Sequence, residues 1–461
     1  MVTRSAPGPR GRDLLRVYGL LGRDPLAAFS ELASEYGPAV QFPLTPRHPV
    51  YLLTRPEHAE HVLAAHQGNY IKAFTYRPLR EVLGSGLLTS EGAQWRRHRR
   101  LLQPLFASRH VTGFAPVMAE AAERTVTRWD ALPDGSVLDL TTALGDLTLG
   151  VVGRTLFGAD LAGTATRVGA AVTALQRVVV GASKSPIAWM APRLLRWRLT
   201  ADPRYEPAAS VLDGTVRDII ARRRSAATAG PEETPAEGGF SDLLGALLAA
   251  RDEDGSGLSD AEISDEVMTF FLAGHETTAN ALGWTLTLLS AHPGTRKRLE
   301  AEVDGIIGDR PPGIDDVDKL VWTRAALQES MRIYPPAWTI ERDALVDDEV
   351  AGTAVPAGST VIVPPYLIHR NPDVWDNPEG FDPERFLPES GGSRHRYAYL
   401  PFGGGRRGCI GGGFAQLEAT LALASVIRRY RLDLVPGGWP ERETGITLRP
   451  RHNLTMTVHR R

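Results

Sequence analysis

The sequence predicts a mainly α-helical fold with small β-sheets, in a single large domain spanning residues 1–461. Helical patterns dominate the chain, and runs typical of strands are few and lie near its ends. A long apolar helix is expected in the middle of the chain. Of the 461 residues, 43% are hydrophobic, which is enough for one large core or two smaller ones.

Composition and charge limit the classes of function. The net charge of -2 gives no reason to expect nucleic-acid binding. A single cysteine rules out an internal disulfide and suits a reducing cytosol. The segment 1–25, expected to be an N-terminal extension, contains Pro, Gly and Arg before any apolar run long enough for a signal sequence. We therefore expect a cytoplasmic protein without a membrane anchor.

The expected elements follow one another along the chain. Residues 49–56, PVYLLTRP, are typical of a strand, and residues 225–239, rich in Pro, Gly and Glu, of an exposed loop between helices. Residues 344–364 predict a hairpin with turns at Gly352 and at 356–358, and the last residues, LTMTVHRR, predict a closing strand.

The central helix is expected from Ser259 to about Ser290. It opens with a Ser-x-x-Glu capping box, formed by Ser259 and Glu262, and it is stopped by His-Pro-Gly at 292–294. Its middle is apolar on all sides and should be buried, yet residues 274–278 place a polar group there. Taken alone, these residues are best explained as buried polar groups whose hydrogen bonds are all made. The threonine hydroxyls would bond to carbonyls one turn earlier, and Glu276 would pair with an arginine. The alternative is that these polar residues take part in a reaction.

A glycine-rich segment, PFGGGRRGCIGGGF, occupies residues 401–414. Gly403, Gly405 and Gly408 match the G-x-G-x-x-G pattern of dinucleotide-binding loops. That pattern requires a βαβ unit, whereas one helix and weak strands follow here, so nucleotide binding is a poor interpretation.

Cys409 lies inside this segment. A lone cysteine is often a small buried hydrophobic residue, but these surroundings favour a thiolate. Gly408 and Gly411 allow backbone N–H groups to approach the sulfur, a helix begins near Ile410, and Arg407 adds positive charge. Without a second cysteine or a convincing catalytic histidine, a thiolate is more typical of a metal ligand than of a nucleophile.

The spacing around Cys409 resembles that of a known family. FGGGRRGCIG matches the F-x-x-G-x-R-x-C-x-G pattern of the cytochrome P-450 haem-thiolate monooxygenases, and AGHETT matches the oxygen-activating motif of that family's central helix. The similarity extends from about residue 54 to the last strand. It implies the cytochrome P-450 fold and a structural Glu-Arg-Arg network at Glu329, Arg332 and Arg385.

The resemblance implies heme b as the cofactor, with Cys409 as the axial thiolate ligand of its iron. Phe402 would pack near the sulfur. The positions expected to bind the haem propionates are Trp95, Arg99, Arg342 and Arg407.

The resemblance also gives the central helix a catalytic role. Thr277 would donate a hydrogen bond to oxygen and Glu276 would supply protons, while Ala273 and Gly274 would leave room for oxygen. His275 is assigned no role. The expected partners are O2, a separate ferredoxin and a ferredoxin reductase, because too little chain follows Cys409 for a reductase domain. The candidate docking residues are Arg96, Arg97, Arg100 and Arg406.

The expected substrate is lipophilic, because the candidate lining positions are mostly apolar. These positions are Phe74, Tyr76, Phe270, Ala273, Trp338, Ile340 and Thr447. A terpenoid of bacterial secondary metabolism is favoured, with a fatty acid anchored by Arg77 or Arg80 as the alternative. A different class, a non-oxygenating haem protein or a haem-dependent isomerase, is disfavoured because neither needs proton delivery to oxygen.

Overall fold

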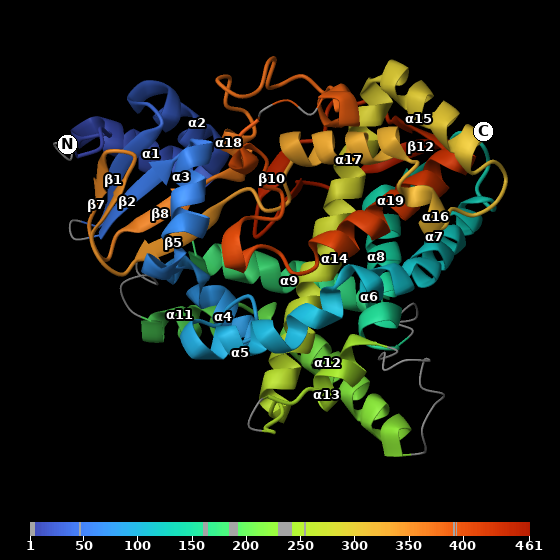
Figure 1. Ribbon diagram of the computed structural model, residues 1–461, viewed down its shortest axis with the longest axis horizontal. Coiled ribbons are helices and arrows are strands. Elements are labelled where there is room, and N and C mark those ends of the chain that lie inside the picture. Colours follow the sequence, from blue (N-terminus) through green and yellow to red (C-terminus); the bar gives the residue numbers. More distant parts are fainter. Residues whose placement is uncertain are drawn as a thin grey trace. The chain divides into compact units, whose positions relative to one another are not determined.

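The computed structural model describes residues 5–45, 48–159, 165–183, 192–228, 242–252, 255–390, 392 and 394–461. Helices predominate and the strands form small sheets, so the predicted fold class is confirmed (Figure 1). The chain divides into two compact units, each assembled from segments that are distant in the sequence.

Unit 1 comprises Met1–Arg77, Gln328–Cys409 and Arg442–Arg449. It contains all five strands of the largest sheet, together with short helices. Its helical elements are α1 (Gly11–Arg23), α2 (Pro25–Tyr36), α3 (Pro56–Glu60), η1 (His61–Ala65), η2 (Gln67–Asn69), η3 (Phe74–Tyr76), α18 (Pro365–Ile368), η5 (Pro383–Phe386), η6 (Pro388–Ser390), η7 (Arg396–Ala398) and η8 (Gly405–Arg407). Its strands are β1 (Ala39–Thr45), β2 (His48–Leu53), β3 (Tyr70–Lys72), β5 (Ile340–Ala344), β6 (Asp348–Val350), β7 (Thr353–Val355), β8 (Thr360–Val363), β10 (Arg442–Thr444) and β11 (Leu448–Pro450), the last of which ends one residue beyond the unit.

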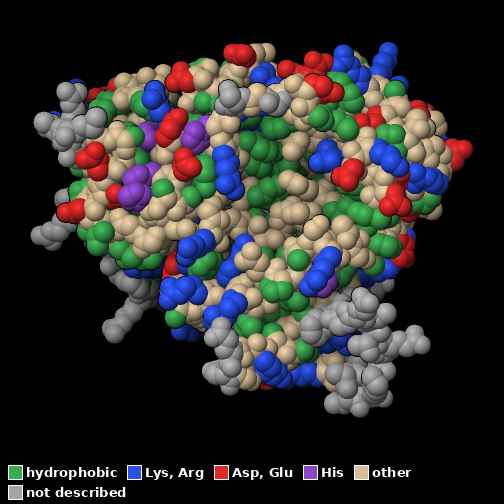
Figure 2. Space-filling view, in the orientation of Figure 1, with side chains coloured by type: hydrophobic (Ala, Val, Ile, Leu, Met, Phe, Trp, Pro, Cys, Tyr) green, Lys and Arg blue, Asp and Glu red, His purple; other side chains and the backbone are tan. Residues whose placement is uncertain are grey.

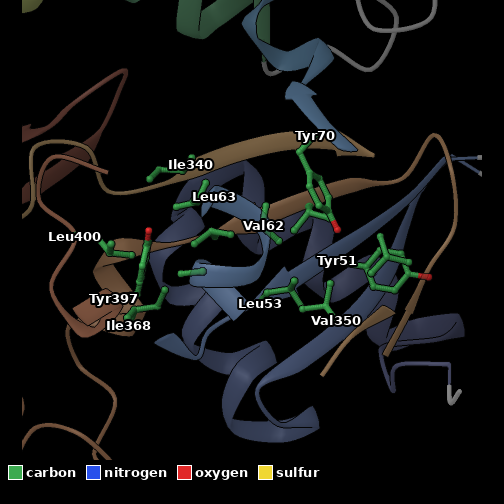
Figure 3. Packing of buried hydrophobic residues seen from close by; sticks show 14 of the residues in the cluster. Tyr51, Leu53, Val62, Leu63, Tyr70, Ile340, Val350, Ile368, Tyr397 and Leu400 are labelled. Atoms are coloured by element: carbon green, nitrogen blue, oxygen red, sulfur yellow. The ribbon is translucent and has the colours of Figure 1, made fainter. Parts of the chain in front are cut away.

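The largest sheet has the strand order β1-β2-β8-β5-β3, in which β2 and β8 are parallel and the other pairs antiparallel. Side chains alternate between its faces, as the period of a strand requires. On β2, Tyr51 and Leu53 join one hydrophobic cluster, whereas Val50 and Leu52 join another. The first cluster also contains Val62, Leu63 and Tyr70 and is drawn in Figure 3. Unit 1 therefore has a core on each face of this sheet.

The segment expected to be an N-terminal extension takes part in the second cluster. Its residues 11–23 form α1, and Val17 is buried there together with Phe29 and Leu32 of α2. An Asp24 side chain that accepts a hydrogen bond from the Ala27 N–H caps α2.

The strands expected from the sequence are present. The predicted strand at 49–56 corresponds to β2, which ends at Leu53 because Pro56 opens α3. In the predicted hairpin at 344–364, β6 and β7 pair antiparallel around Ala351 and Gly352, which both have positive φ angles.

Unit 2 comprises Pro78–Leu327, Ile410–Glu441 and Pro450–Arg461 and is mostly helical. A three-stranded sheet, β4-β12-β9, completes it, and β12 is the predicted closing strand. Its strands are β4 (Ser136–Asp139), β9 (Tyr430–Leu434) and β12 (Thr455–Arg460). Its helices are α4 (Arg77–Leu83), whose first residue belongs to unit 1, α5 (Gly92–Leu102), η4 (Gln103–Phe106), α6 (Ser108–Gly113), α7 (Ala115–Trp129), α8 (Leu140–Leu156), α9 (Ala165–Ser183), α11 (Pro192–Ala201), α12 (Tyr205–Thr228), α13 (Leu243–Ala249), α14 (Asp260–Ala291), α15 (Pro293–Ile306), α16 (Ile314–Val317), the first half of α17 (Val321–Ile333) and α19 (Gly412–Arg429).

The loop expected at 225–239 falls partly outside the described residues. Its first residues, up to Thr228, form the end of α12, and the described chain resumes at residue 242. Across the helices that the structure describes, none combines the length and hydropathy needed to span a membrane.

The predicted central helix is α14, and its capping box is present. The Ser259 N–H donates to Glu262 Oε2 (2.8 Å), and the Glu262 N–H donates to Ser259 Oγ (3.3 Å). Helix α8 packs closely against α14 at Gly274, where an added Cβ would lie 2.8 Å from Val152 Cγ2. Gly274 therefore allows two helix backbones to approach, which differs from its expected role beside oxygen.

The predicted Glu-Arg-Arg network is present in unit 1. Arg332 Nε and Nη2 donate to the two carboxylate oxygens of Glu329 (2.7 and 2.8 Å), and both side chains are fully buried. Arg385 Nε lies 3.4 Å from Glu329 Oε1. The remaining Arg332 donors bind carbonyl oxygens of His369 (2.8 Å), Pro378 (2.6 Å) and Gly380 (2.9 Å). One guanidinium thus fixes a helix and two loops of unit 1.

We predict that Arg332→Leu destabilises the protein by about 3–5 kcal/mol, because it leaves the buried Glu329 carboxylate without its main partner. The fall in thermal midpoint and in the free energy of urea unfolding measures this loss. The matched control on the same helix is Arg324→Leu, which removes an exposed pair with Asp318 (3.5 Å) and should change stability by less than about 0.5 kcal/mol. Equal effects of the two variants would contradict the prediction.

Candidate active site

The cysteine loop, residues 400–409, presents the thiol of unit 1. The Cys409 N–H donates to the Phe402 carbonyl (2.8 Å), and the Gly408 N–H donates to the Gly405 carbonyl (3.1 Å). These bonds close the loop on itself and leave the Cys409 side chain exposed, with Phe402 and Arg407 partly buried. The thiol is therefore held by its backbone and remains accessible to a ligand.

Gly405 is required by the way this loop packs. Its φ angle is +63°, and a Cβ built on it would lie only 1.7 Å from the Leu63 carbonyl oxygen in η1. The backbone of the cysteine loop thus lies directly against the backbone of η1. No other residue could occupy this position without moving one of the two segments.

His369 links the Arg332 network to the cysteine loop, a role not predicted from the sequence. Its Nδ1 bonds to the Arg332 carbonyl (3.2 Å), and its Nε2 accepts from the Leu400 N–H (2.7 Å). Burial and the nearby positive charge of Arg332 lower the pKa of His369 to about 3, so the ring is neutral. The only sequence signal is a histidine shortly after a strand, which equally suits a surface position.

In the centre of α14, the predicted acid and alcohol adjoin an exposed position. Ala273 is exposed although residues 266–272 before it are buried, and the half-buried Thr277 lies one turn later on the same face. Thr277 Oγ1 donates to the Ala273 carbonyl (2.7 Å), so this hydroxyl makes the bond expected of a satisfied threonine. Glu276 Oε2 accepts from Gln176 Nε2 of α9, an amide donor that was not expected from the sequence.

His275 turns toward α8. Its Nε2 would lie 3.3 Å from a Cβ at Gly145, and burial lowers its pKa to about 4.

Helix α5 carries two expected propionate ligands, Trp95 and Arg99, which lie one turn apart and are partly exposed. His98 lies on its buried face, bonded through Nδ1 to Glu266 (2.6 Å) and through Nε2 to Glu262 (3.2 Å) of α14. Burial alone would lower the pKa of His98, but the two carboxylates raise it above 6.5. His98 was not identified from the sequence. Two features could have indicated it: His98 and Leu102 are four residues apart on the buried face of α5, and Glu262 and Glu266 are four residues apart on α14.

Two of the four candidate docking arginines are engaged inside unit 2. Arg97 binds Asp252 (3.2 Å), Glu262 (3.2 Å) and the Gly257 carbonyl (2.7 Å), and Arg100 also pairs with Asp252. The guanidinium of Arg97 is therefore committed to two carboxylates and a carbonyl of unit 2. Arg96 and Arg406 are exposed.

The expected lining residues occupy different environments. In unit 1, Trp338 and Ile340 are each 8% exposed and belong to the two cores, and the Trp338 indole donates to the Gly445 carbonyl (3.1 Å). Thr447 is buried, whereas Phe74 and Tyr76 in η3 are partly exposed. In unit 2, Phe270 stacks on Phe106 with ring centroids 5.4 Å apart. The packing of Trp338 and Ile340 is that of core residues; a shared substrate pocket stays a prediction.

The chemistry of these residues fits haem. An accessible thiol held on a rigid loop suits iron, which thiolates bind well. Buried Arg342 and partly buried Arg407 place guanidinium groups in the same unit as Cys409, and guanidinium groups bind carboxylates such as propionates. Trp95 and Arg99 belong to unit 2, and their role as propionate ligands stays a prediction.

Comparisons with known proteins agree with this chemistry. The sequence model of the cytochrome P450 family matches residues 7–456. "Cyclooctatin synthase" of Streptomyces melanosporofaciens is 37% identical over 99% of this chain and 94% of its own. "Pentalenene oxygenase" of Streptomyces avermitilis is 34% identical over 90% of this chain and 88% of its own. A solved structure described as "Crystal structure of cytochrome P450DA heme domain" is similar with a TM-score of 0.84 and 27% identity, covering 100% of this chain and 99% of that one.

We predict that the stabilising effect of His98 depends on pH. Its folded pKa is raised, so its contribution is complete below about pH 6.5 and is lost as the pH rises through the folded pKa. His98→Gln should therefore lower the free energy of unfolding by about 1.5–3 kcal/mol at pH 6 and by less at pH 9. Urea unfolding across this range measures the difference.

The control for this series is His452→Gln, which changes an exposed histidine of the same unit. Its stability should follow that of the unmodified protein at every pH. A deficit of His98→Gln that stays constant from pH 6 to pH 9 would show that His98 contributes no proton-linked stability.

Proposed function

Because the chain belongs to the cytochrome P450 family and is a P450 monooxygenase, we propose that it uses O2 to oxidise a neutral terpenoid. The observation that carries oxygen activation is the half-buried Glu276–Thr277 pair on α14, which lies close to the exposed Ala273 and between two buried stretches of the helix. An acid beside an alcohol in such a place suits proton delivery and has no evident need in a protein that only binds a ligand.

We propose as haem-binding residues those that the family resemblance assigns. Cys409 Sγ would be the iron ligand, Phe402 would pack near the sulfur, and the guanidinium groups of Arg99, Arg342 and Arg407 with the Trp95 indole would bind the propionates. When bound, the haem supplies the redox chemistry that splits dioxygen and oxidises the substrate.

We propose that Glu276 and Thr277 of α14 deliver protons to the reaction in a fixed order. The Thr277 hydroxyl would give up its bond to the Ala273 carbonyl, at a cost of about 1 kcal/mol, and would then hold a proton at its Oγ1 ready for donation. Glu276 Oε2, positioned by the Gln176 amide, would supply protons through water. Thr277 thus orients a proton at its Oγ1 and Glu276 replenishes it.

We further propose that electrons come from NAD(P)H through a ferredoxin reductase and a separate ferredoxin. Arg406 is exposed on the cysteine loop and Arg96 is exposed on α5, so each offers a cation to an acidic partner. Arg97 and Arg100 are removed from this set because their guanidinium groups bind carboxylates of unit 2.

The proposal of a terpenoid substrate rests on the apolar character of the candidate lining residues and on the names of two relatives. Pentalenene and cyclooctatin, which appear in the names of two relatives, are terpenoid compounds, and the candidate lining residues of this chain include no arginine or lysine. The fatty-acid alternative depends on Arg77 and Arg80, both exposed. A neutral ligand needs neither of them.

We predict that Thr277→Ala lowers the product formed per NADPH oxidised by at least about tenfold, with hydrogen peroxide or water formed instead. The reason is that substrate still binds while the ordered proton donor is lost. The matched control is Thr287→Ala on the same helix, whose hydroxyl bonds back to the Gly283 carbonyl (2.8 Å) in the same way.

This comparison should be run under ¹⁸O2. Label in the product of the unmodified protein supports monooxygenation, and its absence would favour an isomerase or a ligand-binding protein. A coupling ratio equally changed in both threonine variants would remove Thr277 from the mechanism.

We predict that a cyclic sesquiterpene produces the spin-state shift of the ferric holoprotein at lower concentration than a C12–C16 fatty acid does. Visible absorption titrations of the unmodified protein, Arg77→Ala, Arg80→Ala and the exposed control Arg12→Ala measure both ligands. Tighter binding of the fatty acid, abolished by Arg77→Ala or Arg80→Ala alone, would overturn the terpenoid proposal.

A further inference from the structure

A cluster of potential metal ligands lies in unit 1, apart from the residues expected to hold haem. It consists of His61, His66 and Asp348, whose side-chain donor atoms all lie within 4.8 Å of one another. His61 Nε2 is 2.9 Å from Asp348 Oδ2, and His66 Nδ1 is 3.7 Å from Asp348 Oδ1. Figure 2 shows histidine side chains gathered with acidic ones over the region of α3 and the neighbouring strands.

A π-helical turn brings the two histidines together. η1 spans His61–Ala65, and the His66 N–H donates to the His61 carbonyl (2.8 Å) across five residues. In an α-helix, residues five apart point about 140° away from each other. Here the imidazole rings stack, with centroids 3.9 Å apart and planes 15° apart. Single π-turns are rare and often occur at functional sites.

The same turn is fixed by packing from its other side. Val62 and Leu63 are buried in the hydrophobic cluster of Figure 3, together with Tyr70 and Val350. The apolar side of η1 is thereby anchored, while His61, whose side chain is 18% exposed, and the half-exposed His66 lie beside Asp348. The positions of the two imidazole rings therefore depend on the packing of η1 against the core as well as on the stacking of the rings.

The carboxylate is oriented by groups around it. Asp348 is the first residue of β6, and its side chain is only 10% exposed. The Tyr70 hydroxyl donates to Oδ2 (2.8 Å), and the Glu349 N–H donates to Oδ1 (2.8 Å). Outer hydrogen bonds of this kind orient metal-binding carboxylates and raise metal affinity.

Two imidazole nitrogens and one carboxylate oxygen form a donor set typical of Zn2+ and similar ions. Metal bonds of about 2.0–2.1 Å in a tetrahedral site place ligand atoms about 3.3 Å apart. The separation is 2.9 Å from His61 Nε2 to Asp348 Oδ2 and 3.7 Å from His66 Nδ1 to Asp348 Oδ1, so each histidine lies near a different oxygen of a carboxylate that can bind an ion through both. His66 is half exposed, so an ion has access and water can complete the coordination.

We propose that His61, His66 and Asp348 form a binding site for one divalent transition-metal ion of the Zn2+ class. This site differs from the haem site in its ligands, since it uses nitrogen and oxygen donors and no cysteine. Because η1 contacts Gly405 through Leu63, and Gln67 accepts from the Arg406 N–H (3.1 Å), the ion would fasten the segment that supports the cysteine loop.

The site is tested on the full-length holoprotein, free of any histidine tag and treated with a chelator. Isothermal titration with Zn2+ should show one tight site and a higher thermal midpoint. Titration with Co2+ should give the visible absorption of a tetrahedral ion. His66→Ala should weaken Zn2+ binding by at least about tenfold and abolish the thermal shift, because it removes a direct ligand.

Two further variants complete the design. Asp348→Asn should weaken binding in the same way, and His452→Ala, which removes an exposed histidine of unit 2, should bind Zn2+ as the unmodified protein does. The reduced carbon monoxide spectrum and the midpoint without metal establish that each variant is folded. No saturable Zn2+ binding, or affinity unchanged in folded His66→Ala, overturns the proposal.

Discussion

The buried guanidinium of Arg332 is the interaction on which the cysteine loop depends. It has no exposed surface, and its donors bind Glu329 and three backbone carbonyls of unit 1. A buried charge is tolerated only when its hydrogen bonds are satisfied, so the loops that carry these carbonyls have little freedom. His369 is bonded to the Arg332 carbonyl and to the Leu400 N–H. It therefore ties the backbone at the start of the cysteine loop to the helix that carries Arg332. An ion pair within one helix thus helps to fix a thiol more than seventy residues later in the chain.

Local patterns predicted those parts of the fold whose partners are close in sequence. The capping box of Ser259 and Glu262 could be read directly from the spacing of its two residues, whereas the buried pair of Glu329 and Arg332 was expected from the family resemblance. His98 and His369 could not, because a histidine among polar residues is typical of a surface. The partner of His98 is 168 residues away, and only the tertiary structure brings it near.

Helix α14 shows why the centre of the site was only partly predictable. Ala273 and Gly274 are adjacent small residues, and both were expected to leave room for oxygen. Successive helical residues point about 100° apart, so they face different surroundings. Ala273 is exposed, whereas Gly274 accommodates Val152 of α8. Because this helix is apolar on all sides, its sequence contains no signal that separates a packing face from a reactive one.

The contact between Gly405 and the Leu63 carbonyl has a consequence for protein engineering. A Cβ at residue 405 would meet backbone 1.7 Å away, so the fit depends on the path of both chains and not on side chains that could repack. Chimeras that exchange the cysteine loop between homologous enzymes should therefore carry residues 61–66 from the same parent. A crossover between the two segments would combine backbones from different parents, and the Cys409 thiol would be the first group displaced.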